Sequence, residues 1–289
     1  MKARPFDALR MVWHDYPGEW FEQDVNGPEE ARRRIDTFRS LLRSNVAFLL
    51  VDAQKLLDNT GEEERYLKSL MSNFRTGLLS IKDELLEDGK PLVQFPRIWT
   101  MALSKADLLP DVDVYQFRDL LIDKVGEDLD ELRKVIAGLI EASDALSVGE
   151  DFVLLSSAKF EPDKIKVTER IGLDLILPMA AILPFLRHVR WSQATQLPRK
   201  VAESLLSNAG TLAAALIARK KRIPARVENL LSFLNSDLAN EAAKLAGDKL
   251  RKINTDALAR HDQLTATLTG FRMSLDSGER EQILLRSRR

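Results

Sequence analysis

Apolar and polar positions follow two different patterns along this chain. In the first two thirds, four short and almost continuous apolar runs alternate with longer amphipathic segments. Continuous apolar runs are typical of strands that helices cover on both faces of a parallel sheet. We therefore predict an α/β fold with a mostly parallel sheet. The predicted strands are Leu9–His14, Val46–Val51, Ile98–Leu103 and Phe152–Leu155.

The segments between the predicted strands have the apolar spacing of helices. Pro28 suits the first turn of a helix, where its missing N–H is not needed, and two acidic residues follow it. Thr60 and Glu63 match a capping box at the start of another helix. A long helix is predicted over Asp113–Ile140, with an interruption near Gly126.

Beyond Trp191 only helical periodicity remains, and Ala, Leu and Lys are frequent. Apolar residues recur on one helical face after Leu197, and Pro224 is expected to break the chain before further helical segments. A helical hairpin, a small bundle or a coiled-coil segment would each fit. We predict an α/β region over residues 1–192 and an α-helical tail or small bundle over residues 193–289.

Composition and charge exclude several classes of function. The 289 residues include 43 Lys+Arg and 44 Asp+Glu, so the net charge of −1 gives no general attraction to nucleic acid or anionic membranes. The lack of cysteine excludes disulfides, thiolate metal sites and cysteine nucleophiles. The most apolar stretch, Ile171–Leu186, is shorter than the roughly 20 residues of a membrane helix and contains Asp174. We expect a cytoplasmic protein without a transmembrane segment.

Polar residues with possible chemistry follow three of the four predicted strands. After the first, Asp15 stands three residues before Gly18. A carboxylate there can hold Mg²⁺, and the glycine backbone N–H can contact a terminal phosphate without obstruction. After the third, Asp107 can accept hydrogen bonds from guanine N1–H and the exocyclic amine, and the stem of Lys105 can lie against the base.

The third group follows the fourth predicted strand. Ser157–Lys159 contains a small residue, Ala158, that lets backbone N–H groups approach the carbonyl oxygen of a base. Taken alone, the first group equally fits an ordinary strand-to-turn transition. The second alone fits a helix N-terminal loop with a capping Asp better than a base contact, and the third alone fits a plain turn better. Their common order and their position at strand ends distinguish them as a set, because ligands of open α/β sheets bind at these ends.

Asp15–Gly18, Ser104–Asp107 and Ser157–Lys159 resemble the D-x-x-G, [N/T]-K-x-D and S-A-K motifs of P-loop GTPases, in the family's order. The resemblance covers about residues 9–190. It implies the Ras-like, three-layer fold of the TRAFAC class, with bacterial double-GTPase proteins as the nearest relatives. It also implies a molecular switch that binds GTP or GDP with Mg²⁺.

The resemblance carries roles over to individual residues. Asp15 is expected to hold Mg²⁺ through water, and Gly18 to contact the terminal phosphate. Glu19 stands where many members have a water-orienting Gln, and a carboxylate near a polyphosphate is repelled, so fast hydrolysis is not expected. Ser104 replaces the usual Asn or Thr; it keeps a hydroxyl but is shorter than Asn. The expected guanine-nucleotide contacts are Ser104, Lys105, Asp107, Ser157, Ala158 and Lys159.

The phosphate-binding loop that the family requires is missing from the sequence. No G-x-x-x-x-G-K-[S/T] occurs, and the family's order would put it before Asp15. The first strand, the P-loop and switch I are therefore expected to be absent, and nucleotide binding weak or lost. Three explanations stay open: a fragment or misplaced start codon, a degenerate domain, or a P-loop half supplied by a separate chain.

Two functions follow from these alternatives. One is a GTPase that acts as a switch once its missing half is supplied. The other is an inactive pseudo-GTPase interaction module whose C-terminal helices bind a protein partner. A weaker third, contact with nucleic acid or anionic lipid, depends on the basic run at residues 219–222. His14, His188 and His261 lack the spacing of metal ligands.

Overall fold

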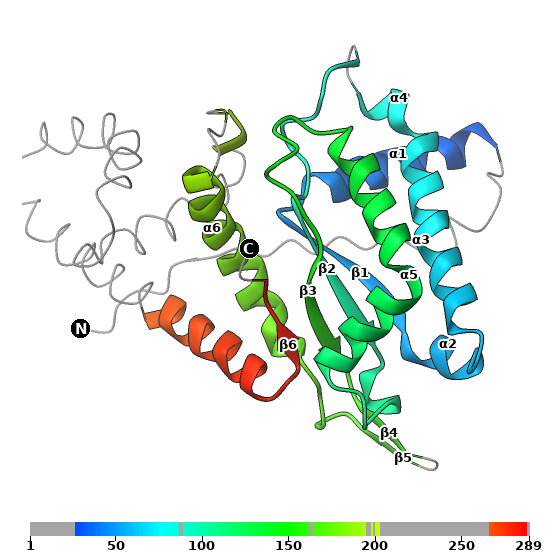
Figure 1. Ribbon diagram of the computed structural model, residues 1–289, viewed down its shortest axis with the longest axis vertical. Coiled ribbons are helices and arrows are strands. Elements are labelled where there is room, and N and C mark those ends of the chain that lie inside the picture. The colour runs from blue at the N-terminus through cyan, green and yellow to red at the C-terminus, as the bar shows by residue number, and fades with distance from the viewer. Residues whose placement is uncertain are drawn as a thin grey trace, which may run out of the picture.

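A computed structural model describes a three-layer α/β fold, with a sheet between two groups of helices (Figure 1). The predicted strand Leu9–His14 and most of the predicted helical tail lie outside the described residues. The described residues are 27–86, 89–161, 164–194, 198, 200–202 and 266–287. The strands are β1 (Val46–Asp52), β2 (Ile98–Ser104), β3 (Ser147–Leu155), β4 (Lys159–Glu161), β5 (Lys164–Lys166) and β6 (Leu284–Leu285). The helices are α1 (Pro28–Leu42), α2 (Ala53–Asp58), α3 (Glu63–Ser80), α4 (Lys82–Leu85), α5 (Val114–Ala137), α6 (Ile176–Ala194) and the short 3₁₀ turns η3 (Ala106–Leu108) and η4 (Leu173–Leu175).

The main sheet has the strand order β1-β2-β3-β6. β1, β2 and β3 are parallel, and β6 is antiparallel to β3. The structure confirms the prediction of a mostly parallel sheet. It also confirms the three predicted strands that lie within the described residues. β3 begins at Ser147, five residues before its predicted start at Phe152, because the N-terminal half of the strand carries polar residues that break the apolar run.

Side chains of β2 and β3 alternate between two separate hydrophobic cores. Trp99 and Phe152 pack with α1, α3 and α5 on one face. Ile98 and Val153 pack with α6 and the C-terminal helix at residues 266–280 on the other face. The continuous apolar runs reflect this double burial, since both faces of a central parallel strand need apolar side chains.

The long helix α5 is interrupted where the sequence predicts. Val125 has φ −141° and ψ 25°, which is a non-helical conformation one residue before Gly126. The capping box expected from Thr60 and Glu63 does not form, and that prediction is wrong. Instead the Thr60 hydroxyl donates to the carbonyl oxygen of Leu57, and the Glu63 carboxylate accepts from the backbone N–H of Gly61.

The C-terminal residues correct the prediction of a tail with helices alone. Leu284 and Leu285 pair with Val153 and Phe152 and add a fourth strand to the main sheet. A two-residue strand has no recognisable period in the sequence, so its pairing depends on the exposed edge of β3. The helix at residues 266–280 precedes this strand and lies beside α6 (Figure 1).

A buried ion pair fixes the C-terminal residues to β3 and α6. Both carboxylate oxygens of Asp151 lie within 2.9 Å of one guanidinium nitrogen of Arg187. Asp151 also accepts from the backbone N–H of Ser287 at 2.9 Å, and Arg190 donates to the carbonyl oxygen of Ser287 at 2.8 Å. Because Asp151 and Arg187 are almost fully buried, the pair replaces hydration that both charges lose on folding.

Candidate functional site

The carboxyl ends of the three parallel strands lie at the same level. Asp52 at the end of β1 is the register partner of Ser104 at the end of β2. Ser104 in turn is the partner of Leu155 at the end of β3. The loops that follow β2 and β3 therefore start side by side, and they contain the predicted Ser104–Asp107 and Ser157–Lys159 groups. This edge of the sheet is where open α/β folds bind ligands.

Lys105 follows β2 in a left-handed backbone conformation, with φ 53° and ψ 39°. Residues other than glycine adopt this conformation at a free-energy cost of about 1–2 kcal/mol, so the surrounding structure must stabilise it. The Lys105 ammonium donates to a carboxylate oxygen of Asp52 at 2.7 Å. Asp52 also caps α2 by accepting from the backbone N–H of Gln54. The ion pair thus ties the loop after β2 to the end of β1.

Asp107 faces the segment that follows β3. One carboxylate oxygen, Oδ1, accepts from the hydroxyl of Ser156, and the other, Oδ2, accepts from the backbone N–H of Phe160 at 2.9 Å. Hydrogen bonds to an ionised carboxylate are stronger than those between neutral groups. The Asp107 carboxylate is therefore held in one orientation by two donors from the segment after β3, one in the loop and one in β4.

Ser156 lies between two oxygen atoms. Its hydroxyl oxygen lies 2.5 Å from Oδ1 of Asp107 and 2.5 Å from the carbonyl oxygen of Ala158. A hydroxyl has one hydrogen to donate, and the ionised carboxylate is the stronger acceptor. Ser157 is exposed, whereas Ser156 and Ala158 are buried. The serine that contacts Asp107 is therefore the one before the predicted S-A-K group.

The remaining predicted residues at this edge have separate contacts. The Ser104 hydroxyl donates to the carbonyl oxygen of Val51 at 3.2 Å, so this short side chain still joins β2 to β1. Lys159 is half-exposed and lies 3.6 Å from the carboxylate of Glu169. Asp15, Gly18 and Glu19, predicted for the phosphate and Mg²⁺, lie outside the described residues.

Two residues at this edge were missed by the sequence analysis. Ser156 orients Asp107, and Asp52 pairs with Lys105. Asp52 directly follows the apolar run of β1, as Asp15 directly follows the first predicted strand. This position after a strand could have identified Asp52 as a candidate site residue. For Ser156 the sequence holds two adjacent serines, and only the register of β3 decides which one points to Asp107.

The arrangement can recognise a flat polar molecule with adjacent N–H donors. An ionised carboxylate has about four acceptor positions on its two oxygens. Two are used by Ser156 and by the backbone of Phe160, one on each oxygen. One acceptor position therefore remains on each oxygen, which matches in number the N1–H and exocyclic-amine donors of guanine. Over the described ranges, no group of three or more His, Asp or Glu side chains is arranged to hold a metal ion.

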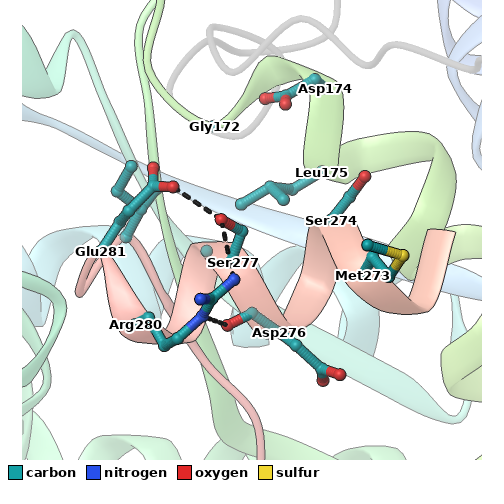
Figure 2. A pocket seen from close by; sticks show the side chains of 11 residues that line it. Gly172, Asp174, Leu175, Met273, Ser274, Asp276, Ser277, Arg280 and Glu281 are labelled. Atoms are coloured by element: carbon teal, nitrogen blue, oxygen red, sulfur yellow. Dashed lines mark hydrogen bonds between the residues drawn. The ribbon is translucent and has the colours of Figure 1, made fainter. Parts of the chain in front are cut away.

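A shallow cavity of about 600 Å³ lies between η4 and the C-terminal helix (Figure 2). Some of its polar groups bond to one another: the Ser277 hydroxyl donates to Glu281 at 2.8 Å, and Arg280 donates to the backbone carbonyl of Asp276 at 3.2 Å. None of the residues from the strand-end loops lines it.

Comparison of the chain with protein-family models, curated proteins and solved structures finds no match. In the part of the chain that the structure describes, none of the helices has both the length and the apolar character needed to cross a bilayer.

Proposed function

We propose that the chain is the base-binding part of a cytoplasmic, guanine-nucleotide-dependent switch of the P-loop GTPase type. The observation that carries this proposal is the orientation of Asp107. Its carboxylate is held by Ser156 and by the Phe160 backbone, with one acceptor position on each oxygen left over. Guanine offers two adjacent donors to such a carboxylate, whereas adenine does not.

Neighbouring groups support the same proposal. The stem of Lys105 starts from the same loop, and the left-handed backbone at this residue is the kind of conformation that is frequent at ligand sites. Ala158 is buried beside Ser156, at the position where the resemblance to P-loop GTPases expects a contact with the base. Asp15 would hold Mg²⁺ through water and Gly18 would contact the phosphate, with Glu19 in the position of the water-orienting residue.

A titration with GDP and ADP tests the proposal. We expect the chain to prefer GDP, with weak affinity because the phosphate-binding loop is missing. Asp107→Asn removes the acceptor pair, and each lost hydrogen bond to a charged group contributes about 1.5–3 kcal/mol. GDP affinity should therefore fall by about tenfold or more. Asp111→Asn removes an exposed carboxylate nearby and serves as the control. Equal affinity for GDP and ADP would contradict guanine recognition.

The second candidate is an interaction module without nucleotide chemistry. It is favoured by the fact that Asp107 already has two partners within its own chain. In this case Asp107 would be a structural residue that joins two loops, and the C-terminal helices would bind a protein. This candidate predicts that Asp107→Asn destabilises the fold while neither nucleotide binds to the unmodified chain at millimolar concentrations.

A further inference from the structure

A backbone donor of the β4–β5 hairpin bonds directly to the strand-end site. Phe160, at the centre of β4, pairs across the hairpin with Ile165. Its N–H points away from β5 and donates to Oδ2 of Asp107 at 2.9 Å. Antiparallel pairs alternate between those that exchange backbone hydrogen bonds and those that do not. Phe160 and Ile165 therefore form a pair of the second kind, and the Phe160 N–H is free for Asp107.

This hydrogen bond joins two residues that are 53 positions apart in the sequence. It sets the orientation of the carboxylate, and it sets the position of the hairpin, which extends from the carboxyl edge of the sheet (Figure 1). β4 also packs directly on η3, the short turn that contains Asp107. A change in the orientation of the Asp107 carboxylate must therefore alter the position of the hairpin, and a shift of the hairpin must alter the orientation of the carboxylate.

On the basis of the proposed function, we propose that guanine binding and the position of the β4–β5 hairpin are coupled through Asp107. A base that bonds to the remaining acceptor positions holds the carboxylate in the orientation that receives the Phe160 N–H. The hairpin in turn pre-orients the carboxylate for the base. Because binding linkage is reciprocal, each event must favour the other by the same factor. The hairpin is then the part of the surface that reports whether the base site is filled.

Two substitutions at one position separate the backbone donor from the side chain. Phe160→Pro removes the N–H and leaves the bonds of the flanking pairs, Lys159 with Lys166 and Glu161 with Lys164, in place. Phe160→Ala keeps the N–H and removes the half-exposed ring. We expect Phe160→Pro to raise the Kd for GDP by roughly fivefold or more relative to Phe160→Ala. Circular dichroism of both variants checks that the fold is kept.

Amide hydrogen exchange gives a second measurement on the unmodified chain. Saturating GDP should slow the exchange of the Phe160 N–H, resolved by NMR, whereas the same concentration of ADP should not. If Phe160→Pro does not fold, this measurement by itself tests the coupling between guanine binding and the hairpin.

Two outcomes are distinguishable. If the chain prefers GDP but the two variants bind it equally and exchange at Phe160 is unchanged, the coupling is overturned and the proposed function stands. If the unmodified chain shows no preference for GDP over ADP, the proposed function fails and the coupling fails with it.

Discussion

The hydroxyl of Ser156 donates to the carboxylate of Asp107, although 49 residues separate the two in the sequence. The contact joins the loops after β2 and β3, which are adjacent parallel strands. It holds one oxygen of the carboxylate while the Phe160 N–H holds the other. The orientation of the proposed base-reading group therefore depends on residues that follow a different strand.

Replacement of Ser156 should weaken guanine binding. Ser156→Ala removes a hydrogen bond to a charged group, and such bonds contribute about 1.5–3 kcal/mol. We expect a loss of GDP affinity of about tenfold, measured by titration. Ser157→Ala is the matched control, because Ser157 is the adjacent serine and is exposed. If Ser157→Ala has the larger effect, the assigned orientation of the loop is wrong.

The ion pair between Asp151 and Arg187 should contribute strongly to stability. Asp151→Asn leaves a buried guanidinium without its main charged partner, and loss of one member of such a pair typically costs about 3–5 kcal/mol. Urea unfolding should show a decrease of this size in the free energy of unfolding. Glu64→Gln breaks the exposed pair with Lys68 and should change stability little. Similar effects of both substitutions would contradict the burial of the Asp151 pair.

His188 should make stability depend on pH. It is buried in α6, and neither ring nitrogen has a hydrogen-bond partner. Burial lowers the pKa of His188 below the ordinary value of 6.5. The unfolded chain therefore takes up this proton more readily than the folded one, and stability falls as the pH decreases below 6.5 toward the lowered pKa. Well above pH 6.5 the effect fades, because His188 is then neutral in both states.

His188→Leu removes the titrating group and the two unpaired nitrogens. Between pH 7.5 and pH 5, the free energy of unfolding should decrease less for the variant than for the unmodified chain. Urea unfolding of both proteins at the two pH values measures this difference. At pH 7.5 it should be as stable as the unmodified chain or more so, since buried polar atoms without partners destabilise. An unchanged pH profile would show that another group is responsible.

Gly172 should not tolerate a side chain. A Cβ at this position would overlap the carbonyl oxygen of Leu154, and the residue has φ +63°. Gly149 has φ +66°, but a Cβ there would lie 3.6 Å from the Leu129 side chain, at ordinary contact distance. Both substitutions to Ala carry the same backbone strain of about 1–2 kcal/mol. Gly172→Ala should therefore be clearly the less stable variant by thermal unfolding, and equal stability would contradict the described packing.

Predictions from the sequence succeeded where the signal is local. The apolar runs of β1 and β2 were found nearly to the residue, because strands buried on both faces need continuous apolar side chains. The interruption of α5 at Val125 was expected from Gly126 alone. The predicted capping box at Thr60 failed because the spacing of two residues does not decide where a helix begins.

The alternation of strands and helices, and the polar residues that follow β2 and β3, can be predicted from local sequence alone. These features depend on the burial of each strand and on the chemistry of neighbouring residues. Both can be recognised in a short segment of the sequence. Three contacts follow from the folded arrangement and not from any local pattern: Ser156 rather than Ser157 contacts Asp107, Lys105 pairs with Asp52, and Leu284–Leu285 joins the sheet. Each of these contacts joins distant parts of the chain, so it follows from strand register and packing, which local patterns do not specify.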